Sequence, residues 1–160
     1  MRFCKYGRAI ALLGILSSCG CSGPSPTKLD LLGNDSSPHA SPDGRYAVYL
    51  HESGGASDPR PTGVYRVQLD SLVVRNVTTG EFAGLDWLPG TDSLVVAGRA
   101  TLKVLSSVSG SGSIIAVTVA HSVSVSQDGN AIVYTCQTGR GVRLCEYVLA
   151  TGQIRQITTY

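Results

Sequence analysis

The sequence predicts an all-β protein, and two features support this fold class. Charged residues make up 15% of the 160 residues, well below the usual quarter, while glycine, serine, threonine and valine are abundant. This composition is typical of short strands and tight turns rather than of helices. The second feature is a repeat with a period of about 40 residues, and we expect each copy to form a small antiparallel sheet.

The repeat has three copies that align without gaps. Each copy passes through a turn rich in Pro, Asp or Gly and continues into an apolar, β-branched or aromatic run; the copies occupy 38–49, 85–96 and 123–134. One column of the alignment holds Asp43, Gly90 and Asp128, and another holds Ala47, Leu94 and Ile132. A repeat of this length is typical of propellers and other repeat arrays.

The turn of each copy predicts two strands that are joined tightly. Proline presets one backbone angle and glycine permits positive φ, so the segments before and after the turn are expected to pair. The predicted turn residues are Ser41, Pro42, Asp43, Gly44, Pro89, Gly90, Ser126, Asp128 and Gly129. Another strand of each unit is expected to end in a small-residue turn, at 78–80, 109–110 and 150–152, before the last strand. About four strands per unit is the size of a propeller blade.

These copies resemble the repeats of the TolB-like β-propeller family, whose pattern runs roughly P-x-W-S-P-D-G, an apolar strand, a strand ending in D-x-x-T-G and a strand ending in L-T. The first copy has Ala40 where the family has tryptophan, and the third ends in Ile157-Thr158. The second keeps Trp87 but reduces the turn to Leu88-Pro89-Gly90. The resemblance covers 38–158 and implies a partial β-propeller of about three four-stranded antiparallel blades. An all-β sandwich with repeated hairpins is the alternative.

Three blades are fewer than the four to eight of closed propellers, so the end sheets are expected to have open faces. Three explanations stay open: a fragment of a larger ancestor, completion by self-association, or a missing strand supplied by the residues before the first copy. The first unit also contains a long insertion at 53–63. Long loops on a rigid β scaffold are common contact sites.

The N-terminus has the pattern of an export signal. Three basic residues precede a short apolar run, 9–16, which is followed by small residues and Cys19, as in a secretory signal peptide. The segment Leu16-Ser17-Ser18-Cys19 resembles the lipobox of bacterial lipoproteins, in which the cysteine is acylated and becomes the new N-terminus. The run is too short to span a bilayer. Cys21 is a poorer lipid acceptor, and a buried apolar helix of a cytosolic protein is the alternative.

We therefore expect a signal peptide at 1–18, a flexible tether at 19–36 and the repeat domain at 37–160. Removing 1–18 takes away three of the 13 Lys and Arg and none of the 11 Asp and Glu, so the mature chain carries 10 − 11 = −1. Because no basic stripe remains, the charge pattern argues against a nucleic-acid partner.

Two of the five cysteines are expected to form a disulfide. Cys136 and Cys145 lie in two apparent strands that flank Gly139-Arg140-Gly141, and an exported chain meets oxidising conditions. A two-residue turn at Arg140-Gly141 would place the two cysteines directly opposite each other, within disulfide distance. Two free, partly buried thiols are the alternative. Zinc needs about four ligands at close spacing, and the sequence has no CxxC or HxxxH pattern.

The sequence contains no convincing active site, and we expect no enzyme activity, cofactor or metal. His39 and His121 precede turn strands in different units and are expected to be solvated or hydrogen-bonded strand-end residues. The stretch 110–113 superficially resembles a nucleophile elbow but is better explained as a hairpin turn. Trp87 is expected in the core rather than on an exposed binding platform.

The TolB-like resemblance implies a non-catalytic protein-interaction scaffold, and the lipobox resemblance implies that it is lipid-anchored at the cell membrane or outer membrane and faces the periplasm or exterior. Its expected partners are the membrane, through lipid on Cys19, and either another protein or a second copy of the chain at the open propeller ends. The alternatives are a lipoprotein that binds a small ligand or polysaccharide, and an accessory propeller fragment of a larger enzyme.

Overall fold

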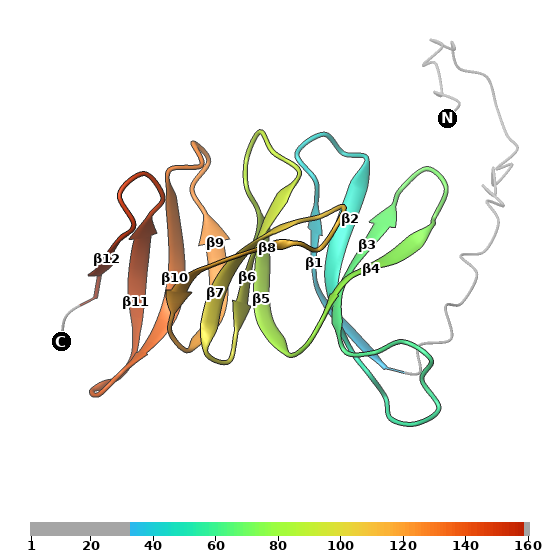
Figure 1. The fold of residues 1–160 in the computed structure, drawn as a ribbon, viewed down its shortest axis with the longest axis horizontal. Coiled ribbons are helices and arrows are strands. Elements are labelled where there is room, and N and C mark those ends of the chain that lie inside the picture. Colours follow the sequence, from blue (N-terminus) through green and yellow to red (C-terminus); the bar gives the residue numbers. More distant parts are fainter. Residues whose placement is uncertain (1–32, 159–160) are drawn as a thin grey trace, which may run out of the picture. The chain divides into compact units, whose positions relative to one another are not determined.

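The computed structural model describes residues 33–158, and these residues form twelve strands and no helix (Figure 1). The first sheet contains β1 (Asn34–Ala40), β2 (Tyr46–Glu52), β3 (Gly63–Gln68) and β4 (Val74–Thr79). The second contains β5 (Phe82–Trp87), β6 (Ser93–Gly98), β7 (Thr101–Ser106) and β8 (Gly112–Val117). The third contains β9 (Ala120–Val125), β10 (Ala131–Thr138), β11 (Gly141–Val148) and β12 (Gln153–Gln156). Within this described range no helix is present that could cross a membrane.

The strands of each sheet pair in chain order, so each sheet is a four-stranded antiparallel meander. β5 of the second sheet packs against β1 and β2 of the first, and β9 of the third packs against β5 and β6. Successive sheets therefore lie side by side through their first strands, as blades of a propeller do (Figure 1). The predicted fold class, a partial β-propeller of three four-stranded blades, is confirmed. β1 begins at Asn34, so the last residues of the predicted tether, 34–36, are strand.

The turns of the first and third copies share one hydrogen-bond pattern. Ser41 Oγ donates to Asp43 Oδ1 at 2.6 Å and accepts from the backbone N–H five residues later at 2.9 Å. Ser126 Oγ makes the same two bonds, to Asp128 Oδ1 at 2.6 Å and from the N–H five residues later at 2.9 Å. Hydrogen bonds lower the pKa of Asp43 to about 2. The Ser41 hydroxyl has the largest effect, and the backbone N–H and side chain of Arg45 add to it. These side chains therefore fix the bend between the first two strands of the first and third sheets.

The second copy makes the same bend with different chemistry. Leu88 and Gly90 stand where the other copies have serine and aspartate, and Pro89-Gly90 with φ +71° at Gly90 matches a type II turn. In the other two copies the positive φ falls at the glycine one column later. The backbone bond from Leu88 N to Ser93 O, at 2.9 Å, is nevertheless kept. The apparently degraded motif is thus a substitute turn.

The first sheet departs from the predicted order of its later turns. The small-residue turns 109–110 and 150–152 separate the last two strands of the second and third sheets, as predicted. Residues 78–80 instead lead from β4 to β5, and the turn between β3 and β4 is 69–73. The predicted position of this turn in the first copy was wrong, because small residues indicate a reversal of the chain without specifying which strands it joins.

Two apolar layers hold the three sheets together. The first and second sheets share a cluster of Val48, Leu50, Val64, Val77, Leu85, Trp87, Leu94, Val96 and Leu105. The second and third share a cluster of Val95, Ala97, Leu102, Ala116, Ala120, Ile132, Tyr134, Cys136 and Cys145. Neighbouring residues of β6, such as Val95 and Val96, enter different layers because successive side chains of a strand point to opposite faces. Trp87 is 5% exposed, so its predicted core position is confirmed.

The predicted disulfide is confirmed, but its predicted register is wrong. Cys136 and Cys145 are bonded, with their Cα atoms 5.8 Å apart. Thr138 pairs with Gly141, which moves the turn one residue earlier and puts Cys136 opposite Arg143. Thr138 Oγ1 donates to Gly141 O at 2.8 Å and stabilises this arrangement. The bond therefore joins diagonal neighbours of β10 and β11, which lie on the same face.

Candidate functional site

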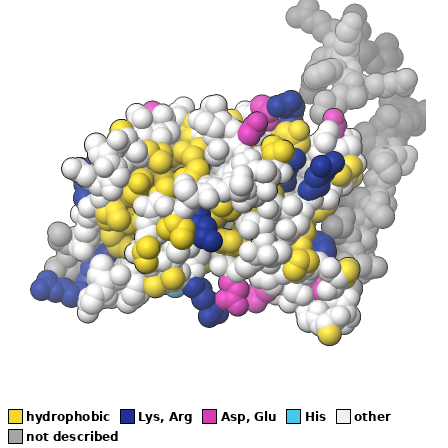
Figure 2. All heavy atoms as spheres, viewed as in Figure 1, with side chains coloured by type: hydrophobic (Ala, Val, Ile, Leu, Met, Phe, Trp, Pro, Cys, Tyr) yellow, Lys and Arg dark blue, Asp and Glu magenta, His cyan; other side chains and the backbone are white. Residues whose placement is uncertain are grey.

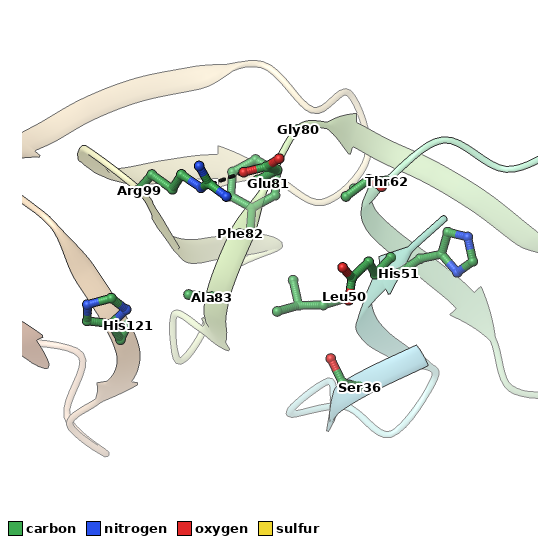
Figure 3. A pocket seen from close by; sticks show the side chains of 12 residues that line it. Ser36, Leu50, His51, Thr62, Gly80, Glu81, Phe82, Ala83, Arg99 and His121 are labelled. Atoms are coloured by element: carbon green, nitrogen blue, oxygen red, sulfur yellow. Dashed lines mark ion pairs between the residues drawn. The ribbon is translucent and has the colours of Figure 1, made fainter. Parts of the chain in front are cut away.

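A cavity of about 370 Å³ opens at one end of the sheets. Its lining includes residues of all three sheets, such as Leu50 of β2, Phe82 of β5 and His121 of β9 (Figure 3). β1, β5 and β9 all begin near this end, because Ser36, Phe82 and His121 belong to their first residues. The cavity thus lies where the innermost strands of the three blades start.

The lining of this cavity combines an apolar floor with an exposed ion pair. Figure 3 shows Leu50 pointing into the hollow below Arg99 and Glu81. Arg99 Nε lies 2.5 Å from Glu81 Oε2, and the two side chains are 85% and 62% exposed. An exposed pair of this kind stabilises the fold little. Because the Arg99 side chain is 85% exposed, its guanidinium is accessible to a ligand. Among residues 33–158, no group of three or more His, Cys, Asp or Glu is arranged to hold a metal ion.

Asp86 connects the first strands of all three sheets. Its Oδ2 accepts a hydrogen bond from the Val125 backbone N–H of β9 at 2.8 Å. Its Oδ1 lies 3.3 Å from Nδ1 of His39 in β1. The neighbouring Trp87 adds a second link to β1, since its Nε1–H donates to the His39 carbonyl at 3.1 Å. One carboxylate and one indole thus fix how the blades sit against each other. The His39 ring lies within ion-pair distance of Asp86.

The insertion between β2 and β3 is held by a buried charge network. The ring of His51 is fully buried, and its Nδ1 lies 2.6 Å from Asp35 while its Nε2 lies 3.0 Å from Asp58. Arg60 lies 3.7 Å from each of the two carboxylates. The insertion is therefore tied to β1 and β2 by two carboxylates, one imidazole ring and one guanidinium.

Within this network, the pKa of the Asp58 carboxyl is lowered by the hydrogen bonds that it accepts. The backbone N–H of Arg60 donates to Asp58 at 2.9 Å, and the Gly54 N–H and the His51 ring are further donors. These bonds lower the pKa of the Asp58 carboxyl, although its burial acts in the opposite direction. The carboxylate form is therefore the one that closes the loop.

The predicted turn residues lie at the other end of the sheets from the 370 Å³ cavity. A smaller cavity of about 250 Å³ lies there, lined by the turn of the first copy, Trp87, and the turn of the second copy. A Cβ built on Gly129 would lie 3.7 Å from Pro89 Cδ, so the third turn reaches the second. The three turns thus form one continuous row. Cys19 and the predicted signal peptide lie outside the described residues.

Sequence reasoning missed both polar groups described above. Asp86 was part of the repeat alignment without an assigned role, and His51 was one unassigned histidine. The available signal was weak: His51 ends an otherwise apolar run, YAVYL, in β2. A polar residue at a buried strand position is usually paired with another polar group, but the sequence does not reveal the partner.

Comparison with solved structures identifies the fold as a β-propeller type. No family model and no curated protein matches the sequence. The structure is similar to TolB from Acinetobacter baumannii, with a TM-score of 0.67 and 15% identity, covering 79% of this chain and 33% of that chain. The fold is that of TolB-like propeller repeats.

The tricorn protease is a second β-propeller with a similar structure. Its TM-score is 0.55 and its identity 12%, and the match covers 72% of this chain and 12% of that chain. The chain described here therefore spans about a third of TolB and a smaller share of the tricorn protease. At these identities the similarity concerns the fold alone.

Proposed function

We propose that this protein is a lipoprotein outside the cytoplasm, anchored through lipid on Cys19, whose TolB-like propeller sheets are a non-catalytic scaffold for protein contacts. The observation that carries the scaffold role is the exposed apolar surface of a rigid β framework. Val117 of β8 and Leu144 of β11 are 84% and 40% exposed. Figure 2 shows hydrophobic side chains gathered in the half of the view where Figure 1 draws the second and third sheets. Contiguous apolar surface of this kind marks interaction sites.

The disulfide supports the proposed location. The Cys136–Cys145 bond lies within a small sheet, and disulfides persist in oxidising compartments such as the bacterial periplasm. The lipobox-like segment before Cys19 provides the membrane attachment, and a second acyl chain makes such attachment stable. The protein would then present its sheets at the surface of the membrane.

Replacing Cys19 with serine tests the anchor. The Cys19→Ser protein is expected to lose the lipid mass on its N-terminal peptide and to leave the membrane fraction, whereas Cys21→Ser keeps both properties. Mass spectrometry of the detergent-extracted protein and cell fractionation provide the two measurements. An unmodified N-terminus at Met1 in the wild-type protein would contradict the proposal.

The scaffold role predicts a defined protein partner at the envelope. Photo-crosslinking from residue 117, which is 84% exposed, should give one discrete adduct in the wild-type background, and residue 70 in the exposed β3–β4 turn serves as the control site. Smears of equal intensity from both sites would argue against a specific scaffold.

The 370 Å³ cavity favours binding of a small ligand or polysaccharide as a second candidate function. Arg99 and Glu81 offer polar contacts above an apolar floor, the composition expected of a binding site. A set of envelope saccharides should then raise the melting temperature of the wild-type protein but not of Arg99→Ala. An accessory role in a larger enzyme is a further alternative, supported only by the shared fold with the tricorn protease.

A further inference from the structure

The two end sheets of the described region differ in how their outward faces are covered. On the first sheet, the face turned away from the second sheet carries His51 and Tyr65, which are 1% and 4% exposed. The insertion 53–63 covers them: Asp58 contacts His51, and the Tyr65 hydroxyl donates to the Pro61 carbonyl at 2.8 Å. The chain thus closes this face with its own loop.

No loop within residues 33–158 covers the outward face of the third sheet in this way. Val48, Val95 and Val133 occupy one column of the repeat, and Val48 and Val95 are 0% exposed because the next sheet covers each of them. Val133 is only half-buried. The repeat therefore builds, on the third sheet, the same contact surface that is buried twice elsewhere in the molecule.

Exposed apolar side chains share this face with Val133, and Leu144 is its diagonal neighbour across the β10–β11 pair. The pairing of β10 with β11 puts Val142 and Leu144 on the same side as Val133. Ile157 joins them, since its N–H donates to the Leu144 carbonyl at 2.8 Å. Val142, Leu144 and Ile157 are 51%, 40% and 48% exposed. We call these four residues the third-sheet face.

The third-sheet face carries no net charge. The register places one acid and one base beside it, Glu146 and Arg155, and these form an ion pair with each other. Ser124 and Thr135 lie opposite or next to Val133 and are neutral. A strongly charged partner would find no complementary charge here, whereas an identical face would meet it without repulsion between like charges.

We propose that the third-sheet face binds the third-sheet face of a second copy of this chain, so that two copies form a two-fold dimer. A two-fold contact is self-complementary and brings the apolar residues of both copies together. A head-to-tail contact would have to displace the insertion held by His51, because that loop occupies the other end face. The inference deepens the proposed scaffold role by naming the partner of this face, and it rests on that role.

A lysine in the centre of the face tests the dimer. Full-length protein extracted in detergent is examined by analytical ultracentrifugation over a range of concentrations. The wild-type protein should have twice the mass of one chain, and Leu144→Lys should raise the dissociation constant at least tenfold. Val108→Lys, a matched change at a 66% exposed valine between β7 and β8 of the second sheet, should leave the dimer intact. Ile157→Lys replaces Leu144→Lys if the latter fails to fold.

The outcomes separate this inference from the proposed function. A wild-type protein that is monomeric at all concentrations overturns the dimer, and so does a dimer that survives both lysine variants. A monomer that still gives the discrete crosslinked adduct from residue 117 with another protein overturns the dimer and leaves the scaffold role standing. A dimer without lipid on Cys19 overturns the anchor and leaves the dimer standing.

Discussion

Asp86→Ala should weaken the joint between all three sheets. The substitution removes the acceptor for the Val125 N–H, which lies 2.8 Å from Asp86 Oδ2, and a hydrogen bond to a charged group contributes about 1.5–3 kcal/mol. The contact with His39, at 3.3 Å and partly exposed, adds less than about 1 kcal/mol. We therefore expect the free energy of unfolding to fall by about 2–3 kcal/mol.

Urea unfolding of the oxidised full-length protein measures this loss. With a urea slope of about 2 kcal/mol per molar, the midpoint should fall by about 1–1.5 M. Asp86→Asn keeps an acceptor oxygen and should lose about half as much. Asp70→Ala, in an exposed turn, should change stability by less than about 0.5 kcal/mol. If Asp86→Ala unfolds at the same urea concentration as Asp70→Ala, the carboxylate does not join the sheets and the reasoning is refuted.

Three further outcomes follow from the described contacts. Replacing both bonded cysteines, nine residues apart, with serine should lower the free energy of unfolding by about 2–3 kcal/mol, as urea unfolding with and without reductant checks. NMR titration should find a pKa of about 2 for Asp43, which Ser41→Ala raises. Because this pKa lies below the unfolded value, the contribution of Asp43 to stability is present above about pH 4 and is lost as the pH falls toward 2. A Cβ at Gly84 would lie 3.0 Å from the β9 backbone, so Gly84→Ala should cost about 1–3 kcal/mol by thermal unfolding. Gly139→Ala, with nothing within 4 Å, is its control.

The sheets could be predicted because each copy of the repeat contains the chemistry of its own turn. Ser41 and Asp43 are two residues apart and bond to each other, as do Ser126 and Asp128. Such bonds need no information from the rest of the fold, so the sequence predicts where these hairpins bend. The core position of Trp87 followed from the same alignment.

The polar links between and across the sheets could not be predicted, because their partners are far apart in the chain. Asp86 accepts from a residue 39 positions away, and His51 meets acids 16 and 7 positions away. Which groups meet depends on how the strands pack. The disulfide register failed for a local reason: Cys136 and Cys145 lie on one face in both the predicted and the observed register, so side-chain alternation cannot tell the two apart.

The difference between the two end faces has a thermodynamic consequence. The first sheet is closed by a loop that belongs to the same chain, so its burial does not depend on concentration. No loop of residues 33–158 covers the third-sheet face, so we expect its burial to depend on the second copy. A ligand that binds only the folded state stabilises it by about 2.7 kcal/mol at 100 times its dissociation constant. In a two-fold dimer, the apparent stability of the wild-type protein must therefore rise with protein concentration. The same rise must be absent from Leu144→Lys and present in Val108→Lys, because only the former substitution lies on the face that the second copy covers.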